Sequence, residues 1–133
     1  MKILCPICQK ILKNNDKDWF CSNNHHFDQA KEGYLHLLPG QKKEHGDEKE
    51  MVQARHAFLA KNYYLFLKEY LISLSANYPH QSLTDFGCGE GYYTRSLVAD
   101  TRIGIDASKI AIKYASKKDP DSQYIVALSL IHI

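Results

Sequence analysis

Four residues near the N-terminus have the types and spacing of a zinc site. Cys5 and Cys8 form the C-x2-C of "CPIC", and Cys21 follows after twelve residues, with His25 and His26 shortly behind it. Zn²⁺ is usually held at tetrahedral corners by four thiolate or imidazole ligands. A C-x2-C turn directs two sulfur atoms to one centre, and the loop after it is long enough to return. The pattern C-x2-C-x12-C-x3-H therefore predicts a zinc site.

The expected role of this zinc is structural. Four protein ligands leave no open position for a reactive water, which makes a catalytic zinc the weaker interpretation. A segment of about 38 residues with few large apolar side chains also needs a bound metal ion to stabilise its fold. The alternative is that the cysteines are small buried residues. Spacing does not decide between His25 and His26, because three or four intervening residues are both permitted.

A glycine-rich turn is the second stretch that could do chemistry. The sequence "DFGCGEGYY" has glycine at positions 87, 89 and 91, a G-x-G-x-G pattern. A dinucleotide fingerprint would need glycine at position 92, where Tyr92 stands, so a nicotinamide site is disfavoured. Glycine lets the backbone approach a ligand closely, since it has no Cβ. We expect Cys88, inside this turn, to be a small buried residue with no part in the zinc site.

Two carboxylates accompany the turn. Asp106 follows Gly87 by 19 residues and is expected at the end of the next strand, where it could accept hydrogen bonds from a ribose. Asp85 opens the turn and could hold the loop or meet an amino group of a ligand. Together these features resemble the S-adenosylmethionine site of class I methyltransferases. A tight turn without a ligand is the alternative.

The elements that must position these residues follow from the apolar patterns. Residues 48–60 are expected to form a helix with Asp47 as N-cap, and 63–76 a second helix, with Asn62 at a bend between them. In the second helix, Leu67, Tyr70, Leu71 and Leu74 form one apolar stripe.

The remainder reads as alternating strands and helices. Strands are expected at 82–87, 101–108 and 122–128, with a helix directly after the glycine turn and another at 109–118. The last helix should bury Ile110, Ala111, Tyr114 and Ala115. This order predicts a parallel sheet. The expected fold class is α/β: a Rossmann-like methyltransferase fold, first three strands only, preceded by a small zinc-ribbon-like module.

Composition and charge divide the chain and exclude some classes. The 133 residues are 44% hydrophobic and 24% charged with a net charge of +2, which by itself indicates neither disorder nor nucleic-acid binding. No apolar run of 18 residues and no signal peptide is visible, so a cytoplasmic protein without membrane association is expected. We expect a zinc-binding module at 1–38, a charged linker at 39–50, and a partial methyltransferase domain at 51–133.

Four stretches together resemble one family, the RlmA-type 23S rRNA (guanine-N1)-methyltransferases. They are "CPIC…CSNNHHFD", "AKEGYLHLLPG", "MVQARHAFLAKNYY" and "DFGCGEGYYT", and the likeness runs from about residue 4 to residue 127. The most specific element is their order along the chain. The sequence departs from the family at His36, where asparagine is usual, and at Asn62, where glycine is common.

The resemblance implies an activity, a cofactor and a partner. The implied activity is methyl transfer from S-adenosylmethionine to guanine N1 in a hairpin of 23S rRNA. The resemblance also implies that the zinc module helps to recognise the RNA and that the protein is a homodimer. It implies that the zinc ligands are Cys5, Cys8, Cys21 and His25. It also implies cofactor contacts at Tyr64, Gly89 and Glu90, beside the candidates Asp85, Gly87, Gly91 and Asp106 from the glycine turn.

The end of the chain differs from the family. The last six residues, "LSLIHI", do not resemble the continuation after "IVA", so we expect a truncated chain or an end produced by a frameshift. The acceptor pocket is built from later strands in this family, so no catalytic residue is assigned and the fragment is expected to be inactive. Two rivals stay open: a small-molecule class I methyltransferase and a non-catalytic zinc-ribbon module that binds nucleic acid.

Overall fold

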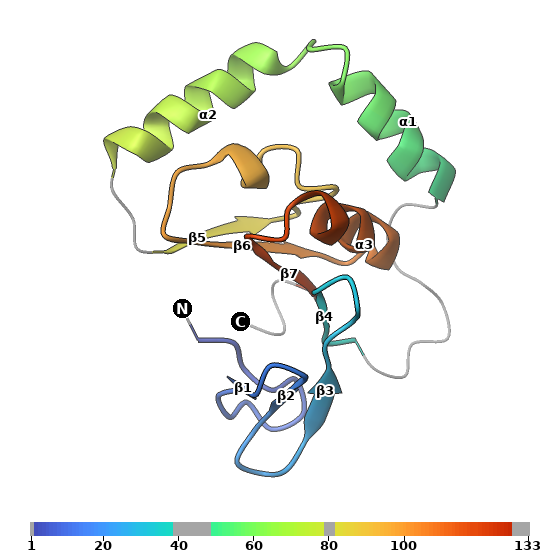
Figure 1. The fold of residues 1–133 in the computed structure, drawn as a ribbon, viewed down its shortest axis with the longest axis vertical. Coiled ribbons are helices and arrows are strands. Elements are labelled where there is room, and N and C mark those ends of the chain that lie inside the picture. Colours follow the sequence, from blue (N-terminus) through green and yellow to red (C-terminus); the bar gives the residue numbers. More distant parts are fainter. Residues whose placement is uncertain (1, 39–48, 79–81, 129–133) are drawn as a thin grey trace.

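The chain is organised around two sheets (Figure 1). The structure is a computed structural model, and it describes residues 2–38, 49–78 and 82–128. An antiparallel sheet contains β1 (Lys13–Asn14), β2 (Asp18–Phe20) and β3 (His26–Asp28). A parallel sheet contains β4 (Leu35–His36), β5 (Ser82–Phe86), β6 (Thr101–Asp106) and β7 (Gln123–Val126), in the spatial order β4-β7-β6-β5. The predicted fold class is confirmed.

Helix α3 (Lys109–Lys118) connects β6 to β7 and packs against both strands. It begins after Ser108, whose Oγ accepts a hydrogen bond from the Ala111 amide at 3.2 Å, an N-cap that satisfies a free helical donor. The predicted buried face is only partly right. Ala111 and Ala115 are buried, but Ile112 and Ser116 complete that face, while Ile110 and Tyr114 are half-buried.

The helix predicted after the glycine turn is wrong. Residues 87–93 form successive turns, and only a short 3-10 helix, η1 (Thr94–Ser96), follows them. The amides of Gly91, Ser96 and Leu97 each bond to the carbonyl three residues earlier, at 2.9, 2.9 and 3.2 Å. This tighter pattern seldom extends far. Leu97 is already extended, with ψ 147°, so the segment turns at once towards β6.

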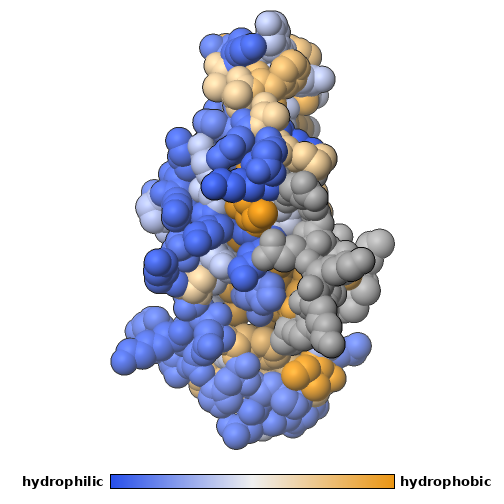
Figure 2. All heavy atoms as spheres, turned by 90° about the vertical axis from the view of Figure 1, so that its right-hand side faces the viewer, coloured by the Kyte–Doolittle hydropathy of each residue, from blue (hydrophilic) through white to orange (hydrophobic). Residues whose placement is uncertain are grey.

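Helices α1 (Lys49–Leu59) and α2 (Leu65–Asn77) form an arch at the upper end of the molecule (Figure 1). The bend predicted at Asn62 is confirmed, since its φ of 64° lies in the left-handed region that asparagine tolerates. The apolar stripe of α2 is not a buried face: Tyr70 is 62% and Leu74 38% exposed. Figure 2, which faces the side of α1, shows apolar and polar side chains mixed at the upper end of the molecule. No described helix has the length and apolarity that a membrane crossing requires.

The N-terminal segment and the parallel sheet share one core. Strand β4 pairs in parallel with β7, with Leu35 opposite Ile125 and His36 opposite Val126. Leu12, Phe27, Leu35 and Leu37 pack in one buried cluster with Ile103, Ile105, Ile125 and Ala127. The zinc module therefore extends the parallel sheet by a strand. Asp47 and most of the predicted linker lie outside the described residues.

Candidate zinc centre and cofactor site

The four residues of the cysteine–histidine pattern converge at one point. The ligand atoms of Cys5, Cys8, Cys21 and His25 all lie within 4.8 Å of one another. His25 Nδ1 is 3.5 Å from Cys5 Sγ and 3.4 Å from Cys21 Sγ, and the sulfurs of Cys8 and Cys21 are 3.6 Å apart. A tetrahedron with Zn–S bonds of about 2.3 Å has edges of about 3.8 Å. The donor set and its spacing therefore fit Zn²⁺.

Two similar turns present the ligands in pairs. In the first, the Gln9 amide bonds to the Cys5 carbonyl at 2.8 Å, and in the second the Asn24 amide bonds to the Cys21 carbonyl at 3.0 Å. Gln9 and Asn24 both have positive φ, 60° and 62°. Each turn thus reverses the chain sharply, so that two donors point to the same side. This is why a short motif can form half of a metal site.

The electrostatics of the two buried cysteines differ. Burial raises the pKa of the Cys5 thiol. Burial also opposes ionisation of Cys21, but hydrogen bonds from the amides of His25 and Asn23 and from the neighbouring thiols outweigh it and lower its pKa to about 6. Because zinc is bound by thiolates, the lowered pKa of Cys21 makes it more ready than Cys5 to bind the metal.

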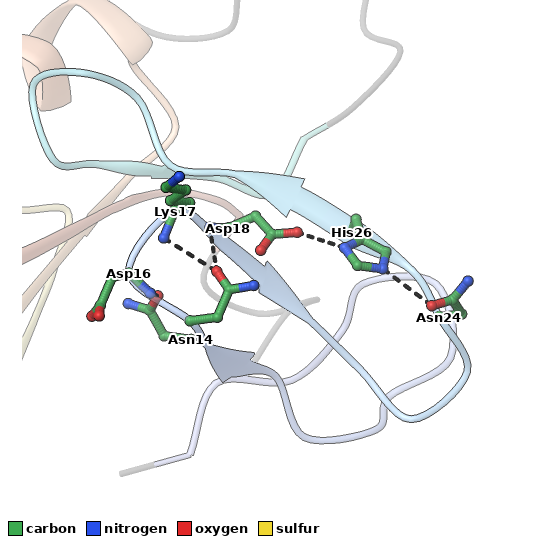
Figure 3. A network of polar contacts seen from close by, with 7 residues as sticks. Asn14, Asp16, Lys17, Asp18, Asn24 and His26 are labelled. Carbon is green, nitrogen blue, oxygen red and sulfur yellow. Dashed lines mark hydrogen bonds and ion pairs between the residues drawn. The ribbon is translucent and has the colours of Figure 1, made fainter.

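His26 is turned towards Asp18 and Asn24, as Figure 3 shows. Its Nδ1 lies 2.5 Å from Asp18 Oδ2 and its Nε2 lies 3.1 Å from Asn24 Oδ1, so both ring nitrogens are engaged on the surface. Its ring also stacks on Phe20, with centroids 5.8 Å apart. The geometry therefore supports His25 as the histidine of the candidate metal site.

A cavity of about 340 Å³ lies between the glycine turn and the junction of α1 and α2. Four of the predicted cofactor residues line it: Tyr64, Gly87, Gly89 and Glu90. The rest of the wall is formed by Arg55, Phe58, Leu59, Cys88, Tyr92 and Tyr93. Three predicted residues, Asp85, Gly91 and Asp106, do not line this cavity and support the turn from behind.

Each supporting residue has a defined contact. Asp106 accepts hydrogen bonds from the amides of Gly89 at 2.9 Å and Ser108 at 2.8 Å, so its carboxylate ties the turn to the end of β6. Asp85 accepts a 2.6 Å hydrogen bond from the buried Thr94 hydroxyl. Gly91 faces the Tyr124 ring, whose hydroxyl lies 2.5 Å from the position that a Cβ would occupy. Of the two roles open to Asp85, the structure therefore contains the loop-holding one.

Sequence reasoning missed His56. Its Nδ1 donates to Glu90 Oε2 at 2.6 Å, joining α1 to the glycine turn. Glu90 is 2% exposed, and its other oxygen, Oε1, is buried without a hydrogen-bond partner among the described residues. In the sequence, His56 is a lone histidine in an expected helix, and its partner Glu90 lies 34 positions away. Such a pair cannot be recognised without the fold.

The comparisons with known proteins agree with this arrangement. Residues 3–45 match the family described as "RlmA, N-terminal", a zinc ribbon. The N-terminal segment is similar to an RlmA-type zinc ribbon. The chain is also 31% identical to a 23S rRNA (guanine(748)-N(1))-methyltransferase of Streptomyces fradiae, over 92% of this chain and 47% of the relative. It is 29% identical to a putative 23S rRNA (guanine-N(1)-)-methyltransferase of Micromonospora griseorubida, over 87% and 48%.

The predicted resemblance to RlmA-type methyltransferases is therefore confirmed. The chain spans about half the length of the curated relatives that it matches. The RlmA-type ribbon accounts for three of the four cysteines, and its match covers the segment that supplies β4 to the parallel sheet.

Cys88, outside the ribbon, is expected to resist alkylation. Burial, together with the carboxylates of Asp106 and Asp85, raises the pKa of its thiol well above the ordinary range. A thiol that stays protonated is a poor nucleophile. With iodoacetamide at pH 8, peptide mass spectrometry should find Cys88 labelled much more slowly in the native chain than in the chain unfolded in urea. Equal labelling of Cys88 in the folded chain would contradict this environment.

Removing the His56 side chain is expected to destabilise the chain through Glu90. His56→Ala leaves a buried carboxylate with neither oxygen paired to a side chain, which should lower the free energy of unfolding by about 1–3 kcal/mol in urea denaturation. The matched control is His56→Ala with Glu90→Gln, which removes the charge as well and should recover part of the loss. Additive losses in the double variant would show that the pair is not coupled.

Proposed function

We propose that this chain is the zinc-ribbon and cofactor-binding part of an S-adenosylmethionine-dependent 23S rRNA (guanine-N1)-methyltransferase. The observation that carries the proposal is the cavity at the carboxyl end of β5, on which four of the predicted cofactor residues converge. Ligands of parallel α/β sheets bind at this edge. The rRNA substrate rests on the similarity to two proteins named for that activity.

The residues around the cavity suit this cofactor. Gly87 and Gly89 let the backbone approach it closely. Glu90 Oε1 offers a buried acceptor to an amino or hydroxyl group of the ligand. Asp106 does not line the cavity, and its carboxylate oxygens accept the amides of Gly89 and Ser108, so its proposed contribution is to hold the turn in the shape that meets the cofactor. Tyr64 lines the cavity from the α1–α2 junction.

The chemistry divides between cofactor and protein. When bound, S-adenosylmethionine supplies a methyl group on a sulfonium whose leaving group is neutral. The residues of this chain bind and orient that group, which is the main protein contribution to an in-line displacement. The candidate zinc ligands Cys5, Cys8, Cys21 and His25 hold the ribbon together and carry out no step of the transfer.

Calorimetry with S-adenosylmethionine tests the cofactor assignment. The purified chain is expected to bind it, and S-adenosylhomocysteine as well, but not NAD⁺. Tyr64→Ala, which changes the cavity wall, should weaken binding about tenfold, a loss of about 1.4 kcal/mol. Tyr63→Ala is the matched control, because Tyr63 is 61% exposed and does not line the cavity. No measurable binding would favour a non-catalytic zinc-ribbon module.

Methylation is a separate question for the 133-residue chain. In the family that it resembles, the acceptor side is built from later strands, so we propose that this chain binds the cofactor without methylating guanine. A primer-extension stop on 23S rRNA treated with the purified chain would contradict this. In a longer protein containing this chain, methylation of small acceptors in place of rRNA would favour the small-molecule rival.

The remaining proposals concern organisation. We propose a zinc-binding RNA-recognition module at 1–38, a linker at 39–50 and a partial methyltransferase domain at 51–133. The homodimer and the cytoplasmic location stay predictions. Light scattering of the purified chain over a range of concentrations tests the first of these.

A further inference from the structure

One face of the zinc ribbon forms a groove that the zinc site and the cofactor site do not use. The groove, of about 440 Å³, is lined by Gln9, Lys10, Ile11, Lys13, Phe20 and Ser22. Ile11 is 45% exposed, whereas its neighbour Leu12 is 5% exposed. Side chains alternate between the two faces of extended chain. Leu12 therefore enters the core shared with the parallel sheet, and Ile11 and Lys13 are left on the outer face.

The strand register places an aromatic ring at the centre of this outer face. Lys13 of β1 is directly opposite Phe20 of β2, and Phe20 is directly opposite His26 of β3. The three residues form a row across the sheet, in which the His26 ring stacks on Phe20. Trp19, the preceding residue, packs against the inner core. Of this row, the cation of Lys13 and the ring of Phe20 line the groove, and the His26 ring lies beside Phe20.

Charge is arranged unevenly on this face. Lys10 and Lys13 line the groove and no carboxylate does. The nearest carboxylate along β2 is Asp18, and it is engaged by His26 at 2.5 Å. Asp18 lies opposite Asp28 in the register, two residues along β2 from Phe20. An anionic group is therefore favoured at the lysine end and disfavoured at the aspartate end.

We propose that this groove binds one nucleotide of an unpaired rRNA segment, with its base on Phe20 and a flanking phosphate at Lys10 and Lys13. Proteins read single-stranded RNA by stacking unpaired bases on aromatic rings and meeting the phosphates with basic side chains. Gln9 and Ser22 supply hydrogen-bonding groups at the rim for the edge of the base. The inference rests on the proposed function, and it names where the ribbon contacts the RNA.

The test measures binding of the chain to a fluorescein-labelled RNA hairpin with an unpaired guanine-containing loop, by anisotropy at several salt concentrations. Phe20→Leu should weaken binding about tenfold and Phe20→Tyr should restore it, because tyrosine also stacks. Lys10→Gln with Lys13→Gln should lower the slope of log Kd against log salt by about 0.7, the value for one phosphate contact on a single strand. Lys17→Gln with Lys31→Gln is the matched control, with the same charge change outside the groove.

The outcomes separate this inference from the proposed function. The proposed RNA site in the groove is overturned by any of three results: equal salt slopes for the two lysine pairs, unchanged affinity of Phe20→Leu, or no RNA binding by the parent chain. Calorimetry with S-adenosylmethionine tests the cofactor site independently. Binding of poly-glutamate as tightly as RNA would also overturn it, in favour of an acidic protein partner. Zinc content and circular dichroism of each variant, equal to the parent, show that the ribbon is folded.

Discussion

His25→Ala is expected to release zinc and unfold the ribbon, whereas His26→Ala retains both. His25 Nδ1 lies within 3.5 Å of the sulfurs of Cys5 and Cys21, so it belongs to the cluster of ligand atoms. Its removal leaves three ligands, and the free energy of zinc binding is largely the folding free energy of such a module. His26 is held by Asp18 and Asn24 on the surface, so its loss should change zinc affinity by less than about tenfold.

The measurement is zinc release to a chromogenic chelator, followed in parallel with circular dichroism. The His25→Ala chain should also lose the thermal stability of the parallel sheet, because Cys5 and Cys21 share a buried cluster with Ile103, Ile105 and Ile125. If the ribbon were an independent unit, His25→Ala would unfold the ribbon alone and leave the thermal transition of the parallel sheet unchanged. The opposite behaviour of the two histidine variants would show that the ligand assignment is wrong.

The zinc cluster could be predicted from the sequence because its information is local. Within each ligand pair the residues are three or four positions apart, and a sharp turn at Gln9 or Asn24 brings them together. The choice between His25 and His26 needed the structure or a family, because both spacings can reach the metal. What excludes His26 is its contact with Asp18, on the neighbouring strand.

The parts that sequence could not predict depend on long-range partners. β4 belongs to the segment of the zinc site, and nothing in "YLHLL" indicates that it pairs with β7, about 90 residues later. The helix expected after the glycine turn failed for a related reason. The strand–turn–helix order favoured a helix, but the amides of Gly91, Ser96 and Leu97 form i to i−3 bonds and the chain is extended at Leu97.

The contact between Gly91 and Tyr124 is the other long-range feature that the sequence concealed. The third glycine of the turn was interpreted as a ligand contact, since glycine-rich turns approach cofactors. In the structure the space beside it is filled by a tyrosine from β7, whose hydroxyl also donates to Asp119 at 3.0 Å. Burial, with Asp119 nearby, raises the pKa of Tyr124, so its proton stays available for that hydrogen bond.

Gly91→Ala is therefore expected to be among the most destabilising single substitutions in the chain. A Cβ there would lie 2.5 Å from the Tyr124 hydroxyl oxygen and 3.2 Å from Ala115 Cβ, at a φ of 74°. The left-handed conformation costs about 1–2 kcal/mol for alanine, and overpacking adds about 1–3 kcal/mol. Urea denaturation should show a loss of about 2–5 kcal/mol.

Gly87→Ala is the matched control for this prediction. Its φ of 77° imposes the same backbone strain, but a Cβ there would meet nothing within 4 Å. It should lose only the conformational part, about 1–2 kcal/mol. Because Gly87 lines the cavity, it should instead weaken binding of S-adenosylmethionine. Tyr124→Phe removes the closest atom. Combined with Gly91→Ala in one chain, it should recover part of the stability that Gly91→Ala alone loses. Equal losses in the two glycine variants would mean that backbone strain alone, and not the tyrosine, requires the third glycine.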